Sequence, residues 1–184
     1  LAKVETEALP HALDPVAAIE AGYPHVTAPL KLERGDVEAG FASAPNRIKG
    51  RMVIGGQDHM YLEGQIAFAI PDQDMTATGK RHDFVVDYDV AFDDKGRIEA
   101  VGGSFAARCG YSSDLSGPVT DRALFHADNA YFYPHVRLES RPMKTNTVSN
   151  TAFRGFGGPQ GVIVAERMIE EIAYATGQDP LDVR

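Results

Sequence analysis

Alternating apolar and polar residues dominate the middle of the chain and predict β-strands there. The clearest pair covers 83–92 and 97–108, joined by the short turn Asp93-Asp94-Lys95-Gly96, and predicts a β-hairpin. The same alternation predicts four further strands, at 4–9, 47–54, 60–70 and 131–141.

Helical periodicity is clearest near the C-terminus, where apolar residues recur on one face from 159 to 176 and Gly177 supplies a stop. Shorter helices are expected at 15–21, 37–42 and 117–127, and a further one begins within the last residues. Asp14 and Asp36 stand at the N-cap positions of the first two. This mixture predicts an α+β fold with mixed or antiparallel sheets and flanking helices, with two lobes meeting near 71–80.

Composition excludes several classes of protein. With 184 residues and 43% apolar content, the chain can bury a core. A net charge of -8 without a basic run argues against a nucleic-acid partner, and no apolar run approaches the length of a membrane span. The single cysteine, Cys109, excludes an internal disulfide and fits a reducing compartment such as the cytoplasm.

Residues 152–161 form a glycine- and aromatic-rich segment that leads directly into the long C-terminal helix. Pro159 suits the first helical turn, and free N–H groups at the helix start would favour an anion. Arg154 adds a planar cation, and two phenylalanine rings flank it. This set suits a phosphorylated or enolate-bearing aromatic ligand. Glycines that only permit tight packing at a helix start are an equally good interpretation.

Two other candidates are weaker on local pattern alone. Gln57 follows a Gly-Gly turn and offers a neutral donor and acceptor, whereas Asp58 and His59 are better explained as surface or structural residues. Arg122 becomes a ligand candidate only if its helix lines the same cleft as the glycine-rich loop. P-loop, dinucleotide-binding, His-Glu-x-x-His and serine-elbow motifs are absent from the sequence, and its histidines show no i, i+4 pair.

Several motifs together resemble the molybdenum-binding subunit of the xanthine dehydrogenase family. They are GGQDHMYLE at 55–63, RALFHADNAY at 122–131, MKTN at 143–146, FRGFGGPQ at 153–160 and the helix from 165 onward. They occur in family order and cover essentially the whole chain, so chance matching is not a serious competitor.

The resemblance implies a molybdopterin enzyme that hydroxylates a purine with water-derived oxygen, while Fe-S clusters and FAD lie on other domains or subunits of an oligomeric enzyme. It implies that Gln57 hydrogen-bonds an oxygen ligand of molybdenum and that Arg154 and Gly155 lie against the cofactor. It places Phe156 against the substrate ring. Arg122 is implied as the catalytic cation that polarises the purine carbonyl, and it favours xanthine because related aldehyde oxidases lack it.

This sequence departs from the family pattern in one important respect. The family motif Gly-Gly-Phe-Gly-Gly-Lys-Glu, whose glutamate is the general base, is missing, and the chain passes directly from Pro71 to Met75 across 72–74. We therefore expect two partial portions of one molybdopterin-binding domain, 1–74 and 75–184, cut from a longer chain. Two hypotheses remain open: an inactive piece of a catalytic subunit, or a non-catalytic pterin- or nucleotide-binding module.

Overall fold

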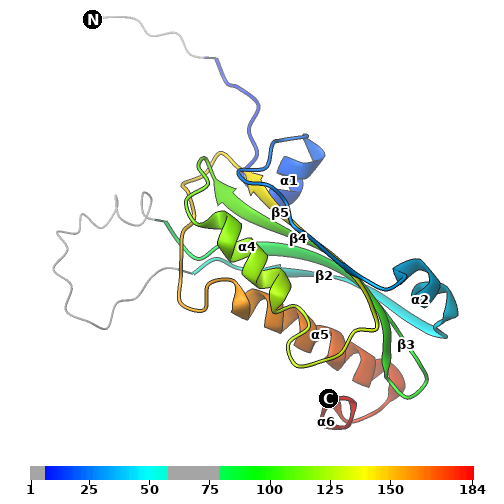
Figure 1. Cartoon of the computed structure of the whole chain (residues 1–184). Helices are drawn as coiled ribbons and strands as arrows, with labels where there is room; N and C mark the ends of the chain where they lie inside the picture. Colours follow the sequence, from blue (N-terminus) through cyan, green and yellow to red (C-terminus); the bar gives the residue numbers. More distant parts are fainter. Residues whose placement is uncertain (1–6, 58–78) are drawn as a thin grey trace, which may run out of the picture.

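A computed structural model describes residues 7–57 and 79–184, which form one curved five-stranded sheet with helices on both faces (Figure 1). The strands are β1 (Lys31–Arg34), β2 (Asn46–Ile54), β3 (Phe84–Phe92), β4 (Ile98–Gly110) and β5 (His135–Lys144). The helices are α1 (Pro15–Glu20), α2 (Val37–Ser43), α4 (Ser116–Phe125), α5 (Gly158–Thr176) and α6 (Pro180–Val183).

The sheet is mixed, with the strand order β1-β5-β4-β3-β2. Only the β4–β5 pair is parallel among the described strands, because α4 carries the chain back between them. This confirms the predicted α+β class. Strands from both sides of 72–74 share the sheet, since β2 pairs with β3 along its whole length from Asn46↔Phe92 to Ile54↔Phe84.

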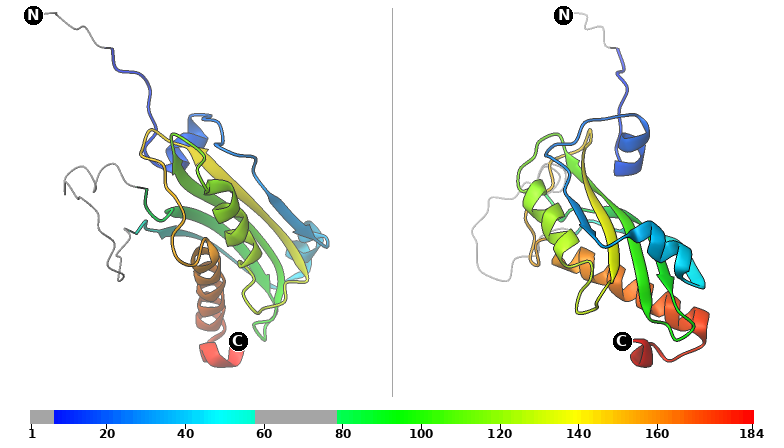
Figure 2. Two further views of the ribbon diagram at one scale, coloured as in Figure 1. Left: turned by 60° about the vertical axis from the view of Figure 1, so that its left-hand side comes forward. Right: turned by 45° about the vertical axis from the view of Figure 1, so that its right-hand side comes forward.

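The main core lies between the sheet and the α4–α5 layer, while α1 and α2 cover parts of the opposite face (Figure 2). Alternate residues of β3 point into this core, including Phe84, Val86 and Val90, each fully buried. Leu124 of α4 and Ile172 of α5 meet them from the helical side. The long helix is therefore held by its apolar face, as its periodicity predicts.

Local capping signals placed the short helices correctly. The Asp14 side chain accepts hydrogen bonds from the N–H groups of Val16 and Ala17, and Asp36 accepts one from Ala39. Gly177 ends α5 with a φ of 69°, in the left-handed region that glycine enters freely. Each of these signals lies within a few residues of the helix end that it specifies.

Two predictions made from local pattern were wrong, and one strand was not predicted. The part of the 4–9 segment that is described, 7–9, is not a strand. The strand predicted at 131–141 begins only at His135, because Pro134 precedes it and 131–134 form a loop. β1 was missed, since its four residues show no alternation and it exists by pairing with β5. The strand predicted at 60–70 lies outside the described residues.

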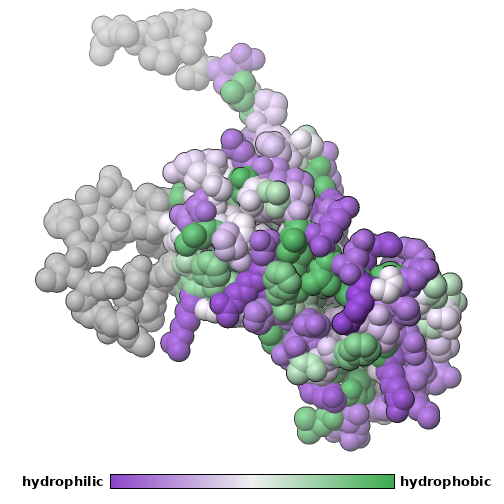
Figure 3. All heavy atoms as spheres, viewed as in Figure 1, coloured by the Kyte–Doolittle hydropathy of each residue, from purple (hydrophilic) through white to green (hydrophobic). Residues whose placement is uncertain are grey.

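Every helix in the described ranges is too short or too polar to cross a membrane. Hydrophobic side chains nevertheless reach the surface near α4 (Figure 3). Phe125, at the end of that helix, is 63% exposed.

Candidate functional site

The glycine-rich loop turns sharply just before α5. Gly155, Phe156 and Gly157 all have positive φ, at 92°, 52° and 94°. A phenylalanine in the left-handed region is strained, and such strain persists only where the surrounding structure imposes it. The partly buried ring of Phe156 packs against the main core. Backbone and packing together therefore fix the direction of this ring.

Two of the loop glycines are required by contact between helices. A Cβ atom on Gly157 would lie 2.0 Å from the carbonyl oxygen of Val119, and one on Gly161 would lie 2.2 Å from that of Ala123. Both oxygens belong to the backbone of α4, so neither can move aside alone. The packing interpretation that the sequence left open therefore accounts for Gly157 and Gly161.

The first amide groups of α5 already have acceptors. Gly158 N donates to Gly155 O at 3.0 Å, while Gln160 N and Gly161 N both donate to Gly157 O, at 3.1 and 3.2 Å. Pro159 has no N–H group. The predicted anion seat of free N–H groups is therefore wrong for these residues. A negatively charged ligand near the loop has to be met mainly by side chains.

Arg154 presents its guanidinium to solvent, with no ion pair or hydrogen bond to another described residue. Its carbonyl oxygen, however, accepts a hydrogen bond from Nη2 of Arg81 at 2.7 Å. The Arg81 guanidinium also lies over the Phe153 ring, 4.0 Å from its centroid. Sequence reasoning missed Arg81, because nothing in its local pattern distinguishes it from an ordinary surface arginine.

Gln57 lies at the end of the segment that follows β2, and its side chain is exposed. Its carbonyl oxygen accepts a hydrogen bond from the Arg81 N–H at 2.8 Å. Arg81 therefore connects the Gly-Gly-Gln turn to the glycine-rich loop, although the two are about a hundred positions apart in the sequence. Asp58 and His59, the weaker acid–base candidates, lie outside the described residues.

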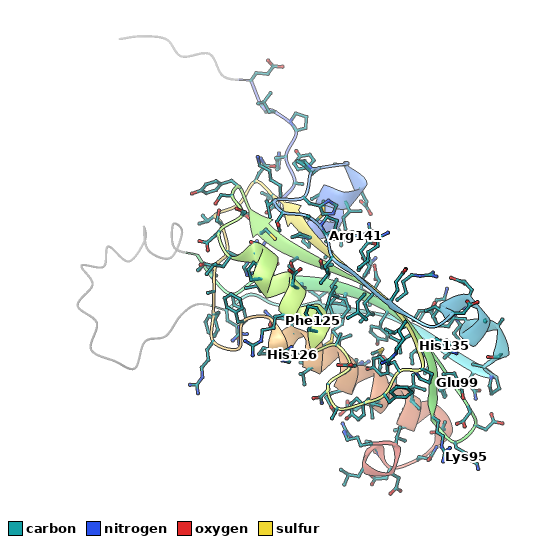
Figure 4. The ribbon with its side chains drawn as sticks, in the orientation of Figure 1. Lys95, Glu99, Phe125, His126, His135 and Arg141 are labelled. Atoms are coloured by element: carbon teal, nitrogen blue, oxygen red, sulfur yellow. The ribbon has the colours of Figure 1, made fainter. Side chains whose placement is uncertain are left out.

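Arg122 lies beside the first residue of α5. Its Nε atom is 3.8 Å from the position that a Cβ atom on Gly158 would take, and the His126 ring is 3.5 Å from the same point. Figure 4 labels His126 and Phe125 at the C-terminal end of α4, close to the start of α5. Within 7–57 and 79–184, the exposed guanidinium of Arg122 has no ion-pair partner. The helix that carries Arg122 therefore lies beside the start of α5, and the role of Arg122 as a ligand residue stays a prediction.

A buried polar cluster underlies the loop. His82 Nε2 and Ser116 Oγ are 2.8 Å apart, and Gln160 Nε2 donates to the His82 carbonyl oxygen at 3.2 Å. Burial lowers the pKa of His82 to about 4 and raises the pKa of the nearby Cys109 thiol to about 12, so both are neutral near pH 7. The hydrogen bonds of this cluster join the segment just before β3 to α4 and α5.

The described contacts connect the predicted residues in two groups. One group reaches the loop at Arg154, before Phe156 in the sequence, and the other reaches it at Gly158, after Phe156. Gln57 reaches Arg154 through Arg81, and Arg122 reaches the start of α5. No direct contact joins Gln57 to Arg122 in the described part of the chain. A hollow of about 570 Å³ elsewhere, lined by residues such as Phe41, Arg51 and Asp87, includes none of these predicted residues.

The chain belongs to the molybdopterin cofactor-binding domain family, which it matches over residues 19–74 and 72–184. It is 31% identical to rat xanthine dehydrogenase/oxidase over 231 residues, covering 84% of this chain and 17% of the rat protein. It is 45% identical to xanthine dehydrogenase of Dictyostelium discoideum over 113 residues, 61% of this chain and 8% of that protein. The resemblance drawn from the motifs is thereby confirmed, for a chain that spans less than a fifth of these relatives.

The match to xanthine dehydrogenase of Drosophila pseudoobscura pseudoobscura extends over 259 residues at 31% identity and covers the whole chain and 19% of the relative. Because this chain has only 184 residues, 75 positions of that alignment (259 less 184) have no counterpart here. The family match is also divided in two, and its two parts meet at 72–74.

Solved structures agree on the fold. Aldehyde oxidoreductase from Desulfovibrio gigas superposes with a TM-score of 0.81 at 22% identity, over 98% of this chain and 29% of that one. Quinoline 2-oxidoreductase from Pseudomonas putida gives 0.75 at 18% identity, over 99% and 34%. At these identities the likeness establishes the architecture of the domain.

Proposed function

We propose that this chain forms the substrate-facing part of a molybdenum centre in a xanthine dehydrogenase-type hydroxylase that acts on a purine such as xanthine or hypoxanthine. The observation that carries the proposal is that α5 begins between Phe156, held at a φ of 52°, and Gly158, beside which lies Arg122, a cation without an ion-pair partner among the described residues. A fixed aromatic face and a forked cation suit a flat heterocycle that bears a carbonyl group.

The side chains near the loop fit an anionic, oxygen-rich cofactor. Gln57, Arg122 and Arg154 are exposed and have no side-chain partner among the described residues, and the buried Nε of Arg81 also lacks one. They supply donors of amide and guanidinium type, in a chain whose net charge is -8. In this proposal Gln57, Arg154 and Gly155 hold molybdopterin, whose molybdenum Gln57 contacts only through an oxygen ligand.

When bound, molybdopterin supplies the two-electron oxidation that places water-derived oxygen on the substrate ring, and the electrons leave through Fe-S clusters and FAD on other domains or subunits. Arg122 donates hydrogen bonds to the ring carbonyl as negative charge develops on it. Such fixed donors contribute about 3–4 kcal/mol to transition-state stabilisation. Phe156 excludes water from one face of the ring and orients it. We place the full enzyme, an oligomer, in a reducing compartment such as the cytoplasm.

We further propose that this chain alone is inactive, because 1–74 and 75–184 are two portions of one domain from which an internal segment is missing. The 75 unmatched alignment positions and the division of the family match at 72–74 support this. The same observation favours a second candidate, a non-catalytic pterin-binding module, because the glutamate motif of the family is absent from the sequence.

The test uses the chain with the missing segment restored from the Drosophila relative and assembled with its Fe-S and FAD partners. In that enzyme, Arg122→Met should lower kcat/KM for xanthine by about 10²–10³ and for an aldehyde by less than about tenfold. Arg167→Met, on the exposed face of α5, is the matched control and should change neither by more than about twofold.

Two results would count against the proposal. Equal losses for xanthine and for the aldehyde would show that Arg122 is structural. Pterin binding without any turnover in the restored protein would favour the non-catalytic module instead.

A further inference from the structure

Arg81 connects the two segments that carry the proposed cofactor residues. It directly precedes the buried His82 and the start of β3. Its N–H donates to the Gln57 carbonyl oxygen at 2.8 Å, and its side-chain Nη2 donates to the Arg154 carbonyl oxygen at 2.7 Å. One residue therefore bonds the Gly-Gly-Gln turn through its backbone and the glycine-rich loop through its side chain.

The Arg81 side chain is partly buried and has no ion-pair partner among the described residues. Its Nε atom is buried and has no hydrogen-bond partner in that part of the chain, and burial lowers the pKa of the guanidinium. The nearby carboxylate of Asp83 instead pairs with Arg108 at 2.8 Å. The side chain is therefore held by its hydrogen bond to the Arg154 carbonyl and its contact with the Phe153 ring, and not by an ion pair with a described residue.

The planar shape of the guanidinium accounts for its contacts. Its carbon lies 4.0 Å from the centroid of the Phe153 ring, while an N–H at its edge reaches the carbonyl of the next residue, Arg154. A Cβ atom on Gly155 would lie 3.9 Å from Nη1. Stacking and edge donation together hold two successive loop residues, Phe153 and Arg154, in a geometry that a lysine ammonium cannot reproduce.

We propose that Arg81 is a positioning residue that fixes the backbone of 153–155 against the Gly-Gly-Gln turn. It thereby sets the direction of the Arg154 side chain and of the Phe156 ring that follows. The claim that Arg81 supports cofactor binding rests on the proposed function. The claim that Arg81 orders the loop does not, so an experiment can refute either claim without the other.

The test measures loop order without cofactor or substrate. Trypsin cleaves after arginine, and Arg154 itself reports on the loop, so mass spectrometry can follow cleavage of the Arg154–Gly155 bond over time. Arg81→Met should accelerate cleavage at this bond by about tenfold, since the loop loses both a hydrogen bond from a charged donor and the contact of that donor with the Phe153 ring. Arg81→Lys should restore less than half of the protection. Arg51→Met, which removes an exposed arginine bonded to Asp87, is the control and should leave the rate unchanged within about twofold.

Phe153→Leu provides a second variant that keeps Arg81 and removes only its stacking partner. It should raise cleavage at the same bond, and it carries the test if Arg81→Met fails to fold. Unchanged cleavage in a folded Arg81→Met protein would overturn the proposal, as would complete protection by lysine. If Arg81→Met does not fold, unchanged cleavage in Phe153→Leu would overturn it equally.

Discussion

Replacing Gly157 with alanine should destabilise the fold through both backbone strain and helix packing. Gly157 has φ 94° and ψ -26°, and an L-residue in left-handed backbone costs about 1–2 kcal/mol. The new Cβ atom would lie 2.0 Å from the carbonyl oxygen of Val119 and 3.0 Å from its carbonyl carbon. Because both are backbone atoms, α4 and α5 must separate, and overpacking of this kind costs about 1–3 kcal/mol. The expected total is about 2–5 kcal/mol.

Gly177 provides a control at the other end of the same helix. Its φ is 69°, also left-handed, but a Cβ atom there meets nothing within 4 Å. Gly177→Ala should therefore lower the free energy of unfolding by about 1–2 kcal/mol, from strain alone. The difference between the two variants isolates the contact between α4 and α5.

Urea unfolding followed by far-ultraviolet circular dichroism measures this difference. If the gap is about 2 kcal/mol, the unfolding midpoints should differ by about 1 M urea, since the slope for a chain of this size is about 2 kcal/mol per molar. The melting temperatures should differ by about 4–8 °C. Equal destabilisation by both substitutions would refute the argument that α5 begins in tight contact with the α4 backbone.

Two further predictions concern the buried polar cluster. Burial lowers the pKa of His82 to about 4, so between about pH 6.5 and about pH 4 the imidazole is protonated in the unfolded chain but not in the folded one. Up to about 3 kcal/mol of the free energy of unfolding should therefore be lost as the pH falls through that range. Urea titrations at several pH values should show this slope in wild type and in His126→Gln, and a flatter one in His82→Gln; an unchanged slope would contradict the assignment. The Cys109 thiol, whose pKa burial raises to about 12, should react with a thiol reagent at pH 8 at least about 100-fold more slowly than in urea. As the only cysteine in the sequence, it gives an unambiguous signal, and rapid labelling of the native protein would contradict its enclosure.

The elements predicted correctly from sequence are those whose cause is local. Asp14 and Asp36 cap helices that begin at the next residue, and the 93–96 turn lies within the hairpin that it closes. β1 has no such local cause, because Lys31 pairs with Glu139 from a distant part of the chain. A short strand without alternation becomes recognisable only once its partner is in place.

The candidate site divides in the same way. Local pattern made Gln57, Arg154 and the loop phenylalanines candidates and Arg122 a conditional one, while the family motifs supplied their roles, which remain proposals. The sequence around Arg81 does not indicate its role. That role depends on contacts with Gln57, Phe153 and Arg154, which only folding brings together. The sequence also predicted that free N–H groups at the start of α5 bind an anionic ligand. In the structure these N–H groups donate hydrogen bonds to carbonyl oxygens of the loop.

Packing and ligand binding were weighed as competing explanations of the glycine-rich loop, yet the geometry makes them dependent on each other. Gly157 and Gly161 allow α5 to begin against the α4 backbone, and that contact sets Arg122 beside Gly158. The same tight entry holds Phe156 at a φ of 52°, between two glycines of positive φ. A larger residue at Gly157 would therefore disturb the positions of both Arg122 and Phe156 without touching any ligand. A glycine in this motif can serve a binding site by bringing two other side chains together.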